Sequence, residues 1–78
     1  MAMPSFIDRV THNPAQCGGR PCIRGLRVRV SDVLDMLAGG ATRGDIVRDF
    51  PYLEDEDITA ALQWAAREAE RRVVLAAE

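Results

Sequence analysis

The stretch THNPAQCGGRPCIRG, residues 11–25, constrains the fold of this chain more than any other segment. It contains the turn-forming pairs Asn-Pro, Gly-Gly and Arg-Pro, and it ends at Gly25. Because such pairs interrupt helices and strands, the stretch is predicted to be a loop of roughly fourteen residues. A loop of that length is seldom only a connection, so it is a first candidate for function.

Two short strands are predicted on either side of this loop. Residues 6–10 alternate weakly between apolar and polar side chains, whereas residues 26–30, LRVRV, alternate strictly. In the second segment the leucine and the valines share one face, and Arg27 and Arg29 share the other. We expect the two segments to pair as a strand-loop-strand unit over residues 6–30. Because an isolated pair of strands is barely stable in water, a helix or a second subunit has to cover it.

Two short helices are predicted next. The first covers residues 32–38, with Ser31 as its N-cap, and a Gly-Gly pair ends it. The second covers residues 43–50 and starts after Thr42, where an aspartate three residues later completes a capping box. A proline ends this second helix.

A third and longer helix is predicted from Asp55, its expected cap, to about residue 74. The chain is therefore predicted to be a single domain, residues 1–78, with a trihelical core over 31–66 and a C-terminal helical arm over 67–78. The predicted fold class is mainly α. A short N-terminal β-hairpin or ribbon precedes a three-helix, homeodomain-like helix-turn-helix core that has a long C-terminal helix.

Charge is distributed unevenly along the chain. Residues 1–31 hold five arginines and one acid, a net charge of +4, and residues 32–78 hold five arginines and eleven acids, a net charge of −6. This asymmetry predicts two different partner surfaces and excludes a uniformly basic coat for nucleic acid. The chain has no lysine. Guanidinium groups suit phosphates, carboxylates and the edges of guanine.

The two cysteines are spaced C-x4-C, which a zinc site tolerates. With His12 as a third ligand, one chain still lacks the fourth ligand of a closed site, and redox pairs more often have two intervening residues. We expect two packed thiols, and a zinc-stapled or redox module using Cys17 and Cys22 is an alternative. The sequence shows no secretory segment and no apolar run of about 20 residues, which predicts a cytoplasmic protein with reduced thiols.

Enzymatic chemistry is not predicted. His12 has no nucleophile and orienting acid as obvious partners, and the glycines match no phosphate-binding motif. The acids of residues 54–57 lack the spacing of a calcium loop and are more typical of a helix start. We therefore expect no catalytic residue, no cofactor and no resident metal.

DNA binding follows from the predicted helix order. If the second and third helices form a helix-turn-helix, the third is the reading helix, on which Gln63 suits adenine and Arg67 suits guanine. The acidic first turn of the same helix opposes phosphate binding. The candidate DNA-binding residues are Arg27, Arg29, Arg43, Arg48, Thr59, Gln63 and Arg67.

Residues 10–66 resemble the small bacterial proteins grouped as domain of unknown function 433. The segments that carry this resemblance are PAQCGGRPCIRG, the following RVRV, and FPYLEDEDITAAL. Two positions depart from the family pattern. Leu26 stands where threonine is usual, which removes a hydroxyl, and Asp55 stands where serine or threonine usually caps the third helix. Because aspartate is also a good cap, the expected fold is unaffected.

The resemblance implies an antitoxin of a bacterial type II toxin-antitoxin pair. Such a protein would be a homodimer that binds and neutralises a PIN-like ribonuclease toxin and represses its own operator through the helix-turn-helix. The arm over 67–78 would contact the toxin. The candidate partner-binding residues are Arg20, Arg24, Arg71, Arg72, Val73 and Leu75. The acidic start of the third helix favours an alternative, a protein-protein interaction module without direct DNA binding.

Overall fold

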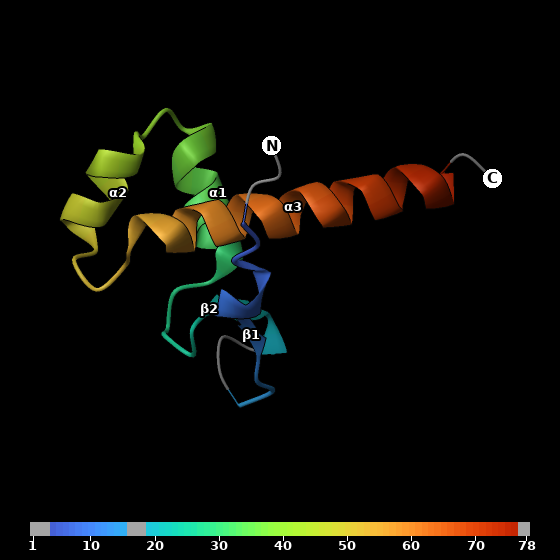
Figure 1. Ribbon diagram of the computed structural model, residues 1–78, viewed down its shortest axis with the longest axis horizontal. Coiled ribbons are helices and arrows are strands. Elements are labelled where there is room, and N and C mark those ends of the chain that lie inside the picture. Colours follow the sequence, from blue (N-terminus) through green and yellow to red (C-terminus); the bar gives the residue numbers. More distant parts are fainter. Residues whose placement is uncertain (1–3, 16–18, 77–78) are drawn as a thin grey trace.

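The computed structural model describes the backbone of residues 4–15 and 19–76, and the side chains of residues 4–15 and 19–71. The protein is mainly α, with a short antiparallel hairpin before three helices, as predicted (Figure 1). Within the described part of the chain, no helix combines the length and the apolarity needed to cross a bilayer. The elements are η1 (Ile7–Arg9), β1 (Val10–His12), β2 (Pro21–Ile23), α1 (Val30–Ala38), α2 (Arg43–Asp49) and α3 (Asp55–Ala76).

The strands lie elsewhere than predicted. Residues 6–10 are mostly a 3-10 turn, η1, and the hairpin instead pairs Val10 with Ile23 and His12 with Pro21. The segment 26–30 is not a paired strand, because β2 is followed at once by a tight turn. Figure 1 shows the hairpin below the middle of α3.

The tight turn after β2 consists of Arg24 and Gly25, whose φ angles of 47° and 69° are both left-handed. The N–H of Leu26 closes it by donating to the carbonyl of Ile23 at 2.7 Å. The chain then folds back along β2, where Arg29 makes a single antiparallel bridge to it. The predicted in-out alternation of residues 26–30 still holds, since the two valines are buried and the two arginines exposed.

The first helix also begins differently from the prediction. α1 starts at Val30, so Ser31 lies inside its first turn and is not the N-cap. The cap contact comes instead from Asp32, which accepts the backbone N–H of Arg29 at 3.1 Å.

The second helix begins as predicted. The N–H of Asp45 donates to Oγ1 of Thr42 at 3.1 Å, and the N–H of Thr42 donates back to the Asp45 carboxylate at 3.0 Å. This reciprocal capping box satisfies two N–H groups that a helix start otherwise leaves without partners.

The core lies where the first half of α3 packs against α1, α2 and the hairpin. Val33, Ile46 and Ile58 are buried there and come from three different helices. Leu62, one turn after Ile58 on α3, is 41% exposed. The second half of α3 projects beyond the other elements (Figure 1).

The cap assignments give a matched pair of variants. Thr42→Ala removes the capping hydroxyl of α2 and is expected to lower the free energy of unfolding by about 1 kcal/mol. Ser31→Ala changes a residue that caps nothing and is expected to stay within about 0.5 kcal/mol of the parent protein. Urea unfolding of both variants measures the difference. Equal losses would contradict the assignment of the two helix starts.

Candidate partner-binding site

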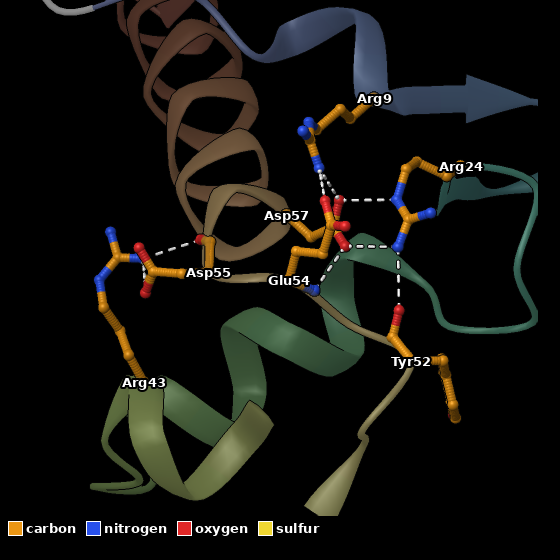
Figure 2. Close-up of polar contacts among 7 residues, drawn as sticks. All are labelled: Arg9, Arg24, Arg43, Tyr52, Glu54, Asp55 and Asp57. Atoms are coloured by element: carbon orange, nitrogen blue, oxygen red, sulfur yellow. Dashed lines mark hydrogen bonds and ion pairs between the residues drawn. The ribbon is translucent and has the colours of Figure 1, made fainter. Parts of the chain in front are cut away.

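The carboxylate of Asp57 is fully buried in the first turn of α3 and joins three segments of the chain (Figure 2). Its Oδ1 accepts hydrogen bonds from Nη1 of Arg9 and from Nε of Arg24, both at 2.9 Å. Its Oδ2 accepts from Nη2 of Arg24 and from the backbone N–H of Glu54, both at 2.8 Å. These four hydrogen bonds use both carboxylate oxygens of this side chain.

The contacts also set the charge of this group. Burial alone raises the pKa of Asp57, but the hydrogen bonds from Arg24, from the N–H of Glu54 and from Arg9 outweigh it and lower the pKa. The hydrogen bond to Glu54, at 2.6 Å, together with that to Asp57, raises the pKa of Arg9. Asp57 is therefore ionised at neutral pH and compensated by two guanidinium groups.

The start of α3 is capped by Asp57, and not by Asp55 as predicted. Asp55 is the first residue of the helix, not the residue before it. The N–H of Glu54, at the position before the helix, is accepted by Asp57 from the third helical position. The aspartate that seemed only to oppose phosphate is thus a buried capping residue, and the sequence signal for it was its place three residues after Glu54.

Arg24 was predicted to bind a partner, and the structure gives its side chain internal contacts. In addition to the two bonds to Asp57, its Nη2 donates to the carbonyl of Tyr52 at 2.9 Å. The left-handed backbone at Arg24 is unusual for a residue with a side chain, and these contacts help to hold it.

Arg43 and Thr59, two predicted DNA contacts, bind each other. Nη2 of Arg43 donates to Oγ1 of Thr59 at 2.8 Å, and Nη1 donates to the carbonyl of Asp55 at 3.2 Å (Figure 2 shows the second contact). Thr59 is only 9% exposed. The pair joins α2 to α3 and leaves the threonine hydroxyl beneath the arginine.

Gln63, the predicted reader of adenine, holds the N-terminal segment. Its Oε1 accepts the backbone N–H of Phe6 at 2.8 Å, and its Nε2 donates to the carbonyl of Pro4 at 2.9 Å. Both ends of the amide are therefore bonded within the chain. A bidentate contact with a base would require both bonds to break.

The remaining arginines fall into two groups. Arg29 and Arg48 make exposed ion pairs with Asp32 and Asp45, at 3.1 Å and 3.0 Å, which contribute little to stability. Four others are exposed, and their side chains have no hydrogen bond or ion pair within the described residues: Arg20, Arg27, Arg67 and Arg71. The side chains of Arg72, Val73 and Leu75, also predicted to bind a partner, lie outside the described residues.

Two of the unpaired arginines line a groove of about 450 Å³ between the hairpin and α3. On the α3 side its residues recur at i, i+3, i+4 and i+7, so they share one face of the helix. The apolar lining comes from Ile7, Val10 and Trp64, and the polar lining from His12, Arg67, Glu68 and Arg71. This spacing of Trp64, Glu68 and the arginines is visible in the sequence, but the opposing wall from η1 and β1 is not.

A second hollow of about 340 Å³ lies at the start of α1. Its wall includes Phe50 and Tyr52, whose rings meet edge to face with centroids 6.1 Å apart. The lining carries Arg27, Asp32 and Asp35, and Asp32 is already bonded to Arg29. The charges nearly cancel, so this hollow has no clear preference for a charged partner.

Cys22 departs from the expected reduced thiol. It is fully buried and disulfide-bonded, and Cys17 lies outside the described residues. A disulfide sulfur is not a thiolate ligand, so the zinc-stapled alternative has no support at Cys22. Within the described ranges, no group of three or more His, Cys, Asp or Glu residues is arranged to hold a metal ion.

Comparison with known proteins gives a family and a related structure. The sequence profile described as "Protein of unknown function (DUF433)" matches residues 10–65. A crystal structure of a DUF433 member protein from Anabaena variabilis ATCC 29413 aligns with a TM-score of 0.75 at 26% identity, over 90% of this chain and 69% of that chain. No curated protein matches this chain.

The matched range divides the arginines. The contacts of Arg24 with Asp57 lie inside residues 10–65, whereas Arg67 and Arg71 lie just beyond them. The contact between Arg24 and Asp57 thus belongs to the segment that the family profile describes, whereas Arg9 precedes that segment and the two groove arginines follow it.

The Asp57 network is expected to govern stability. Asp57→Ala leaves Arg9 and Arg24 without their buried acceptor and is expected to cost about 2–4 kcal/mol in urea unfolding. Asp49→Ala removes an exposed acid that pairs with Arg48 at 3.6 Å and is expected to cost under about 0.5 kcal/mol. Similar costs for the two variants would contradict the role given to Asp57.

The same network predicts the sign of the pH dependence. The pKa of Asp57 is lower in the folded protein than in the unfolded chain, where it is about 3.9. The contribution of Asp57 to the free energy of unfolding is therefore complete above the unfolded pKa and is lost as the pH falls through the folded pKa. In Asp57→Ala, unfolding free energy should therefore fall less steeply below about pH 4 than in the parent protein. An unchanged acid slope would show that Asp57 is not the group responsible.

Proposed function

This chain belongs to the DUF433 family, and from that premise we propose that it is an antitoxin that binds and neutralises a PIN-like ribonuclease through α3 and the adjoining groove. The observation that carries the proposal is the pair of unpaired arginines, Arg67 and Arg71, in the lining of a groove that also has apolar residues in its wall. A nuclease that holds metal ions with a cluster of carboxylates offers an acidic surface to such a pair.

The position of the two arginines supports this role. They are four residues apart, so their side chains lie on neighbouring turns of one face of α3. They are exposed, and they belong to the second half of α3, which projects beyond the other elements (Figure 1). From Arg67 to the end of α3 the helix extends about 15 Å, at 1.5 Å per residue. A partner can thus contact the arginines without displacing any core element.

The other arginines are less suited to this partner. Arg9, Arg24 and Arg43 each donate to acceptors on α3 or just before it. Recruiting them would break internal hydrogen bonds, whereas Arg67 and Arg71 lose no described contact on binding. The candidate site therefore lies along α3, and not at the glycine-containing loop of residues 11–25.

Operator binding has less support than toxin binding. The first turn of α3 is acidic, Thr59 is buried under Arg43, and both ends of the Gln63 amide are bonded. These contacts favour the alternative of a protein-binding module without direct DNA reading by α3. Arg27 and Arg48 remain exposed and would serve only for sequence-independent phosphate contacts.

Homodimerisation stays a prediction. A helix or a second subunit was expected to cover the hairpin, and β1 packs on α3 and β2 on α1 of the same chain. The hairpin therefore does not require a second subunit to cover it. A dimer, if formed, has to be explained by other surfaces, such as exposed Leu62 on α3.

The toxin-binding proposal predicts the effect of reversing two charges. The protein should co-purify with the product of a neighbouring nuclease-like reading frame and suppress its ribonuclease activity. Arg67→Glu combined with Arg71→Glu should weaken that binding by more than about tenfold, because both charges then repel the acidic partner. The control combines Arg27→Glu with Arg48→Glu, which changes the net charge equally and away from the groove.

Equal loss of binding in the two double variants would show that only overall charge matters. Unchanged binding in Arg67→Glu, Arg71→Glu would remove these residues from the interface. No association with any neighbouring nuclease-like product would contradict the proposed function itself.

A separate prediction concerns DNA. If the protein binds its own upstream DNA, a mobility-shift titration gives its affinity for the specific site and for random DNA. Gln63→Ala should change these two affinities to the same extent, because this amide does not read a base. It should also loosen residues 4–6, which hydrogen exchange at the Phe6 amide can detect. A selective loss at the specific site would restore Gln63 as a base-reading residue.

A further inference from the structure

We infer that the groove between the hairpin and α3 seats an acidic amphipathic segment of the partner protein, with a bulky apolar side chain packed on Trp64 and carboxylates facing Arg67 and Arg71. This inference rests on the proposed function, because it names the chemistry of the partner surface at the same site. It goes further by requiring an apolar anchor in addition to negative charge.

The apolar requirement follows from the apolar part of the groove lining. Ile7 from η1, Val10 from β1 and Trp64 from α3 line it, and all three are half-buried in the free protein. Burying the rest of their surface needs an apolar group of the partner. The groove volume of about 450 Å³ is within the range of ligand pockets in proteins, about 300–1,000 Å³.

The charge requirement follows from the two arginines of the groove lining. Arg67 and Arg71 are unpaired within the described residues, whereas Glu68 is the single acid of the lining. A carboxylate that reaches either guanidinium makes a charge-assisted hydrogen bond that the free protein lacks. His12 adds a further hydrogen-bond donor on the hairpin side and carries no negative charge.

The same lining argues against a nucleic-acid backbone as the occupant. Such a backbone offers phosphates but no apolar side chain, so Ile7 and Trp64 would stay half exposed beside it. Tryptophan and arginine together, by contrast, are the residues that most often carry the binding energy of protein interfaces.

The groove is also rigidly placed. Arg9 is the last residue of η1, two positions after Ile7, and its guanidinium pairs with Asp57 in the first turn of α3 and with Glu54 just before that helix. The wall that carries Ile7 and Val10 is thereby tied to the helix that carries Trp64. A preformed site loses little conformational entropy on binding.

Trp64 is the only tryptophan of the chain, so its fluorescence reports on the groove. The probes are three short capped peptides of equal length: one of leucine and glutamate, one of leucine and lysine, and one of serine and glutamate. The leucine-glutamate peptide should shift the emission and bind the full chain at least about tenfold more tightly than the other two. Added salt should weaken this binding, because ionic strength screens the arginine-carboxylate contacts.

A charge exchange tests the orientation of the site. In Arg67→Glu, Arg71→Glu the preference should invert, so that the leucine-lysine peptide binds more tightly than the leucine-glutamate peptide. The control Arg27→Glu, Arg48→Glu should keep the original preference. Thermal unfolding by circular dichroism should be unchanged in Arg67→Glu, Arg71→Glu, whose side chains are exposed and unpaired within the described residues, and should fall only slightly in the control, where Arg48 loses its surface pairs with Asp45 and Asp49.

Three results would overturn the inference: no saturable binding of the leucine-glutamate peptide, equal binding of the serine-glutamate peptide, or no inversion in the charge exchange. The outcome is separate from that of the proposed function. If a neighbouring nuclease co-purifies but the leucine-glutamate peptide does not bind, only this inference is contradicted. If the peptide binds but no nuclease-like product associates, only the antitoxin assignment is contradicted.

Discussion

The buried carboxylate of Asp57 is the contact on which the arrangement of this small domain depends. It accepts hydrogen bonds from η1 through Arg9, from the turn after β2 through Arg24, and from the residue that precedes α3. The two segments that flank the hairpin, η1 and the turn after β2, therefore meet the longest helix at one side chain. A chain of this length buries a modest core, so a charged group compensated in this way fixes the orientation of elements that apolar packing alone leaves adjustable.

This network divides the arginines by role. Those near Asp57 and the start of α3 hold the fold, and those beyond the core on α3 are exposed and unpaired within the described residues. The same division separates stability from binding, because the groove can engage a partner without disturbing Asp57. Arg9 links the two functions, since it anchors on Asp57 the turn that carries the groove residue Ile7.

Local signals predicted the helices well and the site poorly. The Thr42 capping box and the order of three helices follow from neighbouring residues, and the structure has both. The strands were misplaced because the left-handed turn at Arg24 is sustained by Asp57, 33 residues away in the chain. The bond between Phe6 and Gln63 spans 57 residues. No spacing rule reveals such pairs, so the residues chosen to read DNA included several with internal partners.

The central claim is that Asp57 and Arg24 act as one unit that joins the hairpin to α3. A double-mutant cycle with Arg24→Ala and Asp57→Ala, measured as free energy of unfolding in urea, tests it most directly. The account predicts a coupling energy of about 1–3 kcal/mol for this pair and essentially none when Arg67→Ala replaces Arg24→Ala in the cycle. Additive losses for Arg24 and Asp57, or equal coupling with Arg67, would contradict it.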